Sequence, residues 1–236
     1  MIKVCIFDMY ETLVSLFMGR VYFSEDFMKD LNLPGDPYYA YWHETEDART
    51  MGQMTLGEGA AQALQKCGAY TPEAVELLLS KRHESQEDTF SSIPVETFEL
   101  LSGLKKRGIR IGLISNCFSD ERDMIRSSDL MPYFDAVRLS YEQGIKKPEL
   151  RLYFSIAEEL GADPSECMYV GDGGSRELQA AREAGMTAVQ CEWFRPLAYE
   201  PHIPCPVYPE FPQAETREDV LRLIDEMNAR GRTVEE

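Results

Sequence analysis

The chain has 236 residues, of which 44% are hydrophobic and 28% are charged, enough for a hydrophobic core and a small accessory domain. The net charge of -17 disfavours nucleic acids and anionic membranes as partners, because both need a basic face. No apolar run approaches the roughly 20 residues that span a bilayer, and no signal peptide precedes the first predicted strand. We therefore expect a globular protein of the cytoplasm.

The first predicted element is a short apolar strand that ends in a carboxylate. Residues 4–7 are strand-like, and Asp8 follows them directly, ahead of a polar turn. In an open parallel sheet, ligands bind where the chain leaves the carboxyl ends of the strands. Asp8 is therefore a candidate nucleophile, although an acid in such a turn often has only a structural role.

Residues 15–91 are predicted to be almost wholly helical. Proline and glycine residues separate the candidate helices, which cover residues 23–31, 37–49, 56–66 and 72–89. After this insertion, short apolar strands alternate with helices. The strands are predicted at residues 109–114, 136–139, 167–170 and 187–191, and the helices at 94–107 and 150–160. This alternation predicts an α/β fold with a doubly wound parallel sheet.

Polar residues follow these strands just as Asp8 follows the first. Ser115 and Asn116 end one strand, Lys147 lies in a polar turn after the next, and Asp172 follows the strand at 167–170. A carboxylate, a hydroxyl with an amide, an ammonium group and a second carboxylate at one edge of a sheet form a candidate site for an anion and a metal ion.

Taken together and in order, these four segments resemble the four motifs of the haloacid dehalogenase superfamily, over about residues 2 to 190. The resemblance implies a Rossmann-like core of residues 1–14 and 92–236 with an inserted helical cap of residues 15–91. In that family a cap closes over the site and excludes water.

The resemblance also implies roles for individual residues. Asp8 would attack a phosphoryl group and form an aspartyl-phosphate that water then hydrolyses. Ser115 would hydrogen-bond the phosphoryl oxygens, and Lys147 would neutralise charge on the nucleophile and the transferred group.

The same resemblance implies a magnesium ion. Its expected ligands are Asp8, the backbone carbonyl of Tyr10 and Asp172, with Glu177 as the second acid of the last motif. Asp172 and Glu177 are typical of the metal-dependent phosphatases of the family. Without a cation, these acids would repel Asp8 in a closed crevice.

Tyr10 is the main departure from the phosphatase pattern, because most of these enzymes carry an aspartate there as general acid. A phenol, with a pKa of roughly 10, can donate a proton but is a poor base. A tyrosine at position 10 resembles the pattern of the haloacid dehalogenases. In those enzymes the aspartate at the position of Asp8 displaces halide from carbon without a metal. Glu11 is the other candidate acid, although strand-like alternation would turn it away from Asp8. A weakly active protein that binds a phosphorylated ligand is a third hypothesis.

Three further residues are candidates for substrate binding. Thr12 either contacts the substrate or caps the turn that carries Asp8. Asn116 either contacts the substrate or holds that loop. Arg49 lies on a predicted cap helix, where an arginine often serves packing instead.

The last third of the chain carries a segment that cannot form a regular helix. Residues 192–213 include six prolines, so we expect them to wrap the core before a helix from about residue 217 to 227, with a frayed tail after residue 229.

Cys117, beside the Ser115 segment, is a candidate for inhibitory alkylation. Taken with these residues, the resemblance implies a magnesium-dependent phosphatase of a small phosphorylated molecule, and we expect a monomer or homodimer.

Overall fold

The computed structural model describes residues 1–33 and 35–232. In this part of the chain the centre is a six-stranded sheet in which each strand is parallel to its neighbours. The strands are β1 Val4–Phe7, β2 Arg110–Ser115, β3 Ala136–Leu139, β4 Cys167–Gly171, β5 Thr187–Cys191 and β6 Gln213–Ala214. Their order is β3-β2-β1-β4-β5-β6, so the chain winds outward from β1 in both directions. The predicted doubly wound α/β fold is confirmed.

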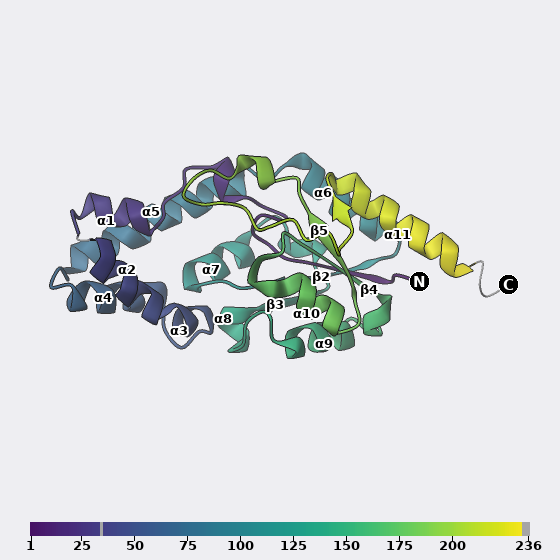
Figure 1. Cartoon of the computed structure of the whole chain (residues 1–236), viewed down its shortest axis with the longest axis horizontal. Coiled ribbons are helices and arrows are strands. Elements are labelled where there is room, and N and C mark those ends of the chain that lie inside the picture. The colour runs from purple at the N-terminus through teal and green to yellow at the C-terminus, as the bar shows by residue number, and fades with distance from the viewer. Residues whose placement is uncertain (34, 233–236) are drawn as a thin grey trace.

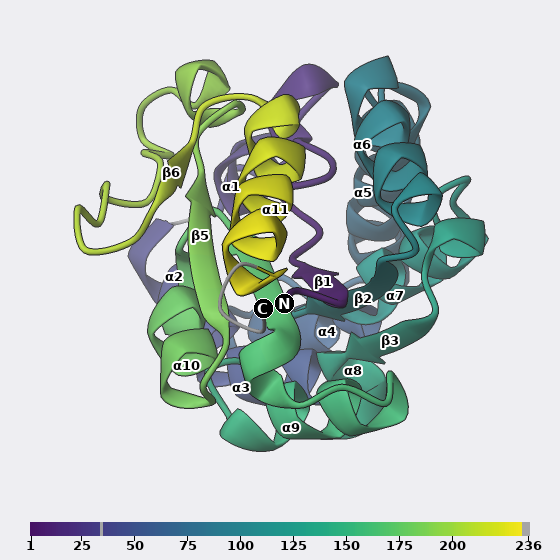
Figure 2. The same cartoon turned by 90° about the vertical axis from the view of Figure 1, so that its right-hand side faces the viewer.

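Helices cover both faces of this sheet (Figure 2). They are α6 Val95–Lys106, α7 Ser119–Ser127, α8 Ser140–Gln143, α9 Leu150–Glu159, α10 Glu177–Glu183 and α11 Arg217–Arg232. On β1, Cys5 and Phe7 pack towards α6 and α11, whereas Val4 and Ile6 pack towards α9 and α10. This period of two is why the strand reads as a continuous apolar run.

A helical lobe, defined here as residues 24–91, lies at one end of the long axis of the molecule (Figure 1). It contains α1 Ser24–Asp30, α2 Gly35–Glu44, α3 Glu46–Thr50, α4 Leu56–Lys66 and α5 Pro72–Ser91. The lobe has its own hydrophobic cluster, which includes Phe27, Tyr38, Trp42 and Leu64. The division into a core of residues 1–14 and 92–236 and a cap of residues 15–91 stays a prediction.

One helix predicted for the lobe is two separate helices in the structure. The helix expected at residues 37–49 is interrupted at Thr45, which lies between α2 and α3 with φ -101° and ψ 3°. The Thr45 hydroxyl donates a hydrogen bond to the Trp42 carbonyl at 3.2 Å. Threonine side chains compete for backbone groups in this way and favour helix ends over helix interiors.

The C-terminal part of the chain differs from the prediction at two places. The strand at residues 187–191 is not the last, because β6 pairs with it through Gln190 and Cys191. Two residues are too few to show a period in the sequence. Helix α11 runs past the predicted end at residue 227 to Arg232, and residues 233–236 of the expected tail lie outside the described residues.

Short 3-10 turns join several of these elements. They are η1 Leu16–Met18, η2 Met131–Tyr133, η3 Pro164–Glu166, η4 Gly174–Arg176 and η5 Arg195–Leu197. Over the described ranges, none of the helices combines the length and apolar character needed to cross a membrane.

Candidate active site

The carboxyl ends of three adjacent strands bring the predicted residues together. Strand β1 lies between β2 and β4, so Asp8, Ser115 and Asp172 meet at one edge of the sheet. Lys147 reaches the same edge from the turn after α8. The sequence therefore placed these four side chains at the correct end of the sheet.

Lys147 forms two short ion pairs inside the site. Its Nζ lies 2.6 Å from Asp8 Oδ1 and 2.6 Å from Glu177 Oε2, and all three side chains are buried. Burial alone would lower the pKa of Lys147, but the charges of Asp8 and Glu177 outweigh it and raise that pKa above its usual value. Lys147 is therefore a permanent cation, and it balances only one of its two partners.

Glu177, at the start of α10, is fully buried and strongly hydrogen-bonded. Its Oε2 accepts from the Tyr169 hydroxyl at 2.8 Å as well as from Lys147, and its Oε1 accepts from the Gly173 backbone N–H at 3.1 Å. The Tyr153 hydroxyl donates to its backbone carbonyl at 3.3 Å. These contacts fix Lys147 in front of Asp8. Tyr169 was not singled out from the sequence, because within a buried strand it looks like any other core aromatic.

The remaining charge in the site is negative. Oxygen atoms of Asp8, Asp172 and Glu177 lie within 4.8 Å of one another. Burial raises the pKa of Asp8 well above its usual range; the charge of Lys147 opposes this shift, and Glu177 and Asp172 add to it. Burial, followed by the charge of Glu177, raises the pKa of Asp172 to about 6. Three carboxylates beside one ammonium group fit a hard divalent cation with oxygen ligands.

The hydroxyl of Tyr10 is committed to the helical lobe. It donates to Gln86 Oε1 of α5 at 2.8 Å, and its ring packs edge-on against Phe90 with centroids 6.2 Å apart. Burial, followed by the charges of Glu121 and Asp120, raises the pKa of Tyr10 well above its usual range. This geometry gives no support to Tyr10 as a general acid, so that role stays a prediction, as does metal binding by its carbonyl.

Glu11 closes the turn that follows Asp8. Its Oε2 accepts from the Ser15 hydroxyl at 2.7 Å and its Oε1 from the Leu16 backbone N–H at 2.9 Å, so it caps η1. Burial raises the pKa of Glu11 to about 7, although these two hydrogen bonds lower it. The residue has a φ of 55°, a left-handed conformation that interrupts the strand-like alternation expected from the sequence.

The other predicted site residues support the loops. Asn116 Oδ1 accepts from the Lys147 backbone N–H at 2.8 Å, so it holds the turn that carries Lys147, while its predicted hold on the Asp8 loop stays a prediction. Thr12 is buried, and its carbonyl accepts from Trp193 Nε1 at 2.8 Å. Within the described part of the chain, the Ser115 hydroxyl makes one long contact of 3.4 Å, with the carbonyl of Asn116, which leaves it available. Their contacts with a substrate stay predictions.

Arg49 lies inside the helical lobe. It is 1% exposed, its guanidinium stacks 3.6 Å from the Trp42 ring centroid, and its Nη1 donates to the Trp42 carbonyl at 2.7 Å. Gly59 of α4 makes room for it, because a Cβ there would lie 2.5 Å from Arg49 Cδ. The geometry explains Arg49 as a packing residue, and its substrate contact stays a prediction without structural support.

Cys117 is buried instead of lying at an accessible rim. It is 2% exposed, and its backbone N–H donates to the Ser140 hydroxyl at 2.9 Å. Burial raises the pKa of its thiol to about 12, so little reactive thiolate forms at neutral pH. The structure therefore argues against the predicted alkylation of Cys117.

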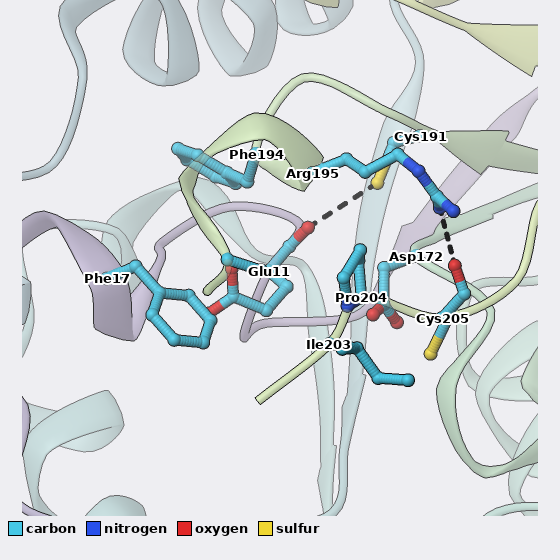
Figure 3. A pocket seen from close by; sticks show the side chains of 10 residues that line it. Glu11, Phe17, Asp172, Cys191, Phe194, Arg195, Ile203, Pro204 and Cys205 are labelled. Carbon is cyan, nitrogen blue, oxygen red and sulfur yellow. Dashed lines mark hydrogen bonds between the residues drawn. The ribbon is translucent and has the colours of Figure 1, made fainter. Parts of the chain in front are cut away.

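A cavity of about 100 Å³ lies beside Asp172 (Figure 3). Glu11 and Phe17 line one side, and residues of the proline-rich segment 192–213 line the other. Gln190, buried in β5, donates to the carbonyls of Asp172 and Pro206, each at 2.8 Å, and so ties this segment to the site. Sequence analysis missed Gln190, and its signal was a polar residue within a buried apolar strand.

The comparison with protein families gives a clear result. A model described as haloacid dehalogenase-like hydrolase matches residues 2–185, which is more than half of the chain. The protein therefore belongs to the haloacid dehalogenase-like hydrolases and is an enzyme of that superfamily.

Curated relatives include several phosphatases. The chain is 30% identical over 129 residues to phosphoserine phosphatase from Thermus thermophilus, covering 54% of this chain and 51% of that protein. It is 27% identical over 124 residues to glyceraldehyde 3-phosphate phosphatase from Methanocaldococcus jannaschii, covering 52% of this chain and 54% of that protein. It is 29% identical over 139 residues to bifunctional epoxide hydrolase 2 from Rattus norvegicus, covering 57% of this chain but 24% of that protein. The matches thus span about half the length of these relatives or less.

Solved structures share the fold at low identity. A 2-haloacid dehalogenase from Pseudomonas syringae pv. Tomato is 19% identical with a TM-score of 0.66, covering 96% of this chain and all of that one. A HAD family enzyme from Bacteroides thetaiotaomicron, in complex with magnesium and inorganic phosphate, is 18% identical with a TM-score of 0.55, covering 80% of this chain and 94% of that one. These likenesses concern the fold alone.

Proposed function

We propose that the protein is a magnesium-dependent phosphatase that acts on a small phosphorylated metabolite. The observation that carries this proposal is the charge balance around Lys147, whose single ammonium group is shared by Asp8 and Glu177 while Asp172 lies within 4.8 Å of both acids. The named phosphatases among the relatives support the same activity. A dehalogenation site needs no cation and has no evident use for the additional acids.

In the proposed reaction a carboxylate oxygen of Asp8 attacks phosphorus, the bond from phosphorus to the leaving oxygen breaks, and an aspartyl-phosphate forms. Lys147 stabilises the charge on the transferred group, and the Ser115 hydroxyl donates to a phosphoryl oxygen. Water then attacks phosphorus and restores the Asp8 carboxylate. The two steps together consume one water molecule. Its oxygen becomes bonded to phosphorus in the released phosphate, and one of its protons balances the proton that the released alcohol carries.

Asp8, the Tyr10 carbonyl and Asp172 would hold magnesium, which supplies charge neutralisation at the phosphoryl oxygens when it is bound. Glu177 is less suited to direct ligation, because Lys147, Tyr169 and Gly173 already donate to its two oxygens. We assign Glu177 the role of positioning Lys147. Residues 15–91 would act as the cap. The hydrogen bond that the Tyr10 hydroxyl donates to Gln86 would join this cap to the turn after Asp8.

A 2-haloacid dehalogenase is the second candidate, favoured by Tyr10 at the position where phosphatases carry an aspartate. In that reaction Asp8 would displace halide from carbon, and water would open the resulting ester. The release of phosphate from a generic aryl phosphate, with magnesium and with chelator, separates the two activities. Asp8→Asn serves as the blank for contaminating phosphatase.

Magnesium-dependent turnover that is lost in Asp8→Asn would support the phosphatase. Metal-independent halide release from a 2-haloacid, again lost in Asp8→Asn, would replace it with the dehalogenase. If neither product forms but inorganic phosphate binds in a magnesium-dependent way, the third hypothesis, a phospho-ligand-binding protein, takes over.

A further inference from the structure

The cavity beside Asp172 has a mostly apolar wall that the phosphoryl chemistry does not use. Phe17 of η1 lines one side, and Phe194, Ala198, Ile203 and Pro204 of the proline-rich segment line the other. Figure 3 shows Phe17, Phe194, Ile203 and Pro204 around the space between Glu11 and Asp172. Asp172 belongs to both the cavity and the acid cluster, so a group in the cavity lies beside one carboxylate of that cluster.

This wall is fixed on its core side. Gln190 donates to the carbonyls of Asp172 and Pro206, and its Oε1 accepts from the Tyr208 backbone N–H at 2.8 Å. The Gln190 side chain is fully buried, where hydrogen bonds of this kind hold their geometry best. The proline-rich segment therefore cannot shift without disturbing the loop that carries Asp172.

The same wall is also held by aromatic contacts with residues 17 and 23, which precede the helical lobe. The His202 ring packs on Phe23 with centroids 3.8 Å apart, and Tyr199 meets Phe17 edge-on at 5.5 Å. Ile203 lies next to these contacts and is 72% exposed, so the rim of the cavity opens to solvent.

The polar groups of the wall are already paired. Arg195 donates to the Cys205 carbonyl and lies 3.4 Å from Glu192, while Glu11 accepts from Ser15 and Leu16. The cavity therefore offers no unpaired cation for a second phosphate or a carboxylate. Its volume is about two-thirds of the roughly 150 Å³ that accommodates benzene in a dry cavity, which leaves room for about four carbon atoms.

We propose that this cavity binds the apolar part of the leaving group, so that the enzyme prefers phosphate monoesters of small aliphatic alcohols to those of polyols. The inference rests on the proposed phosphatase activity and names its substrate class. It assigns the proline-rich segment, together with Phe17, the selection of the alcohol.

The test is kcat/KM, with magnesium, for methyl, ethyl, propyl and butyl phosphate, and for glycerol 1-phosphate as the polyol. Burial of each methylene group raises kcat/KM about fourfold, so butyl phosphate exceeds ethyl phosphate by about 15-fold. A flat series, or a preference for the polyol ester, would overturn the proposal.

Ala198→Phe fills the cavity from its wall and is expected to abolish the dependence of kcat/KM on chain length. Leu197→Phe is the matched control, since Leu197 is the neighbouring residue, is 40% exposed and does not line the cavity. If Ala198→Phe does not fold, Ile203→Asp at the exposed rim replaces it and is expected to lower the preference for butyl phosphate at least tenfold. A chain-length dependence equal to the wild type in the folded cavity variant contradicts the proposal.

A binding measurement separates this inference from the proposed activity. If no phosphate ester is hydrolysed, the phosphatase proposal fails, and calorimetry with magnesium and butylphosphonate or methylphosphonate still examines the cavity. Tighter binding of butylphosphonate, lost in Ala198→Phe and kept in Leu197→Phe, supports the apolar site. Equal affinities for the two phosphonates overturn it.

Discussion

The ammonium nitrogen of Lys147 lies 2.6 Å from Asp8 Oδ1, a contact between residues 139 positions apart in the chain. Glu177 Oε2 lies at the same distance on another side of that nitrogen. The candidate nucleophile therefore shares its counter-ion with a fully buried second acid. This sharing determines the first three predictions.

Lys147→Met leaves the buried Asp8 and Glu177 without a cation. In chelator we expect the free energy of unfolding to fall by about 3–5 kcal/mol, because each uncompensated carboxylate must ionise in a buried site or take up a proton. The neighbouring Lys146 pairs with Asp47 at the surface, so Lys146→Met should change stability by less than about 1 kcal/mol. Urea unfolding curves measure both variants, and equal losses would contradict this account.

Magnesium binding should weaken as the pH falls. The pKa of Asp8 is raised by burial and that of Asp172 is raised to about 6, so below these values a cation must displace protons. Affinity therefore rises with pH, and it falls by up to about tenfold per pH unit for each proton displaced. Calorimetry at pH 5, 6, 7 and 8 in buffers of different ionisation enthalpy counts those protons. Affinity that does not depend on pH would show that protons and cation do not share these carboxylates.

Asp172→Asn and Glu177→Gln should differ in their effect on the affinity for magnesium. Asp172→Asn removes a proposed ligand and is expected to lower affinity at least 100-fold. Glu177→Gln keeps the shape of a side chain already engaged by Lys147, Tyr169 and Gly173, so we expect less than a tenfold loss of affinity with a clear fall in kcat. Titration calorimetry and steady-state kinetics measure the two effects. The reverse order would make Glu177 a direct ligand.

Tyr10→Phe removes the hydroxyl that donates to Gln86. We expect a loss of about 0.5–1.5 kcal/mol of stability and less than a threefold change in kcat, because that proton already has a buried acceptor. Gln86→Leu is the matched variant, since it removes the acceptor from the other side of the same bond. If Tyr10→Phe lowered kcat at least 100-fold while Gln86→Leu left it unchanged, Tyr10 would be restored as the general acid.

Arg49→Ala should unfold more easily without losing substrate affinity. The side chain fills space beside Gly59 and stacks on Trp42, so its removal is expected to cost about 2–4 kcal/mol. Arg20→Ala is the surface control, because the Arg20 side chain is 72% exposed. Thermal unfolding and KM for the aryl phosphate measure the two properties. A tenfold rise in KM at unchanged stability would instead place Arg49 at the substrate.

The sequence was informative wherever chemistry follows a strand. Asp8, Ser115 and Asp172 each come directly after a short apolar run, and parallel strands bring such positions to one edge. It was less informative about distance between segments. Lys147 forms ion pairs with two acids because α10 packs against β4 and brings Glu177 to it. No local sequence pattern predicts this packing.

Burial and pairing explain the other differences. For Arg49 the sequence left packing and substrate binding open, and for Cys117 it predicted a reactive thiol beside the site; the packing of separate segments buries both side chains. Strand β6 has only two residues, and the break at Thr45 depends on one side-chain hydrogen bond. The burial of Arg49 and Cys117 is thus a tertiary effect, whereas the break at Thr45 is a local one and β6 is too short to leave a pattern.

The hydrogen bonds of Gln190 extend the candidate site beyond the residues that the family model matches. The family match stops at residue 185, but the side chain that braces the Asp172 loop is in β5 and its second acceptor is Pro206. A chain truncated at residue 185 would keep Asp8, Lys147 and Asp172. It would lose Gln190, whose hydrogen bond holds the backbone of Asp172. A substitution at Gln190 or in the segment it holds would therefore act on Asp172 from outside the matched residues.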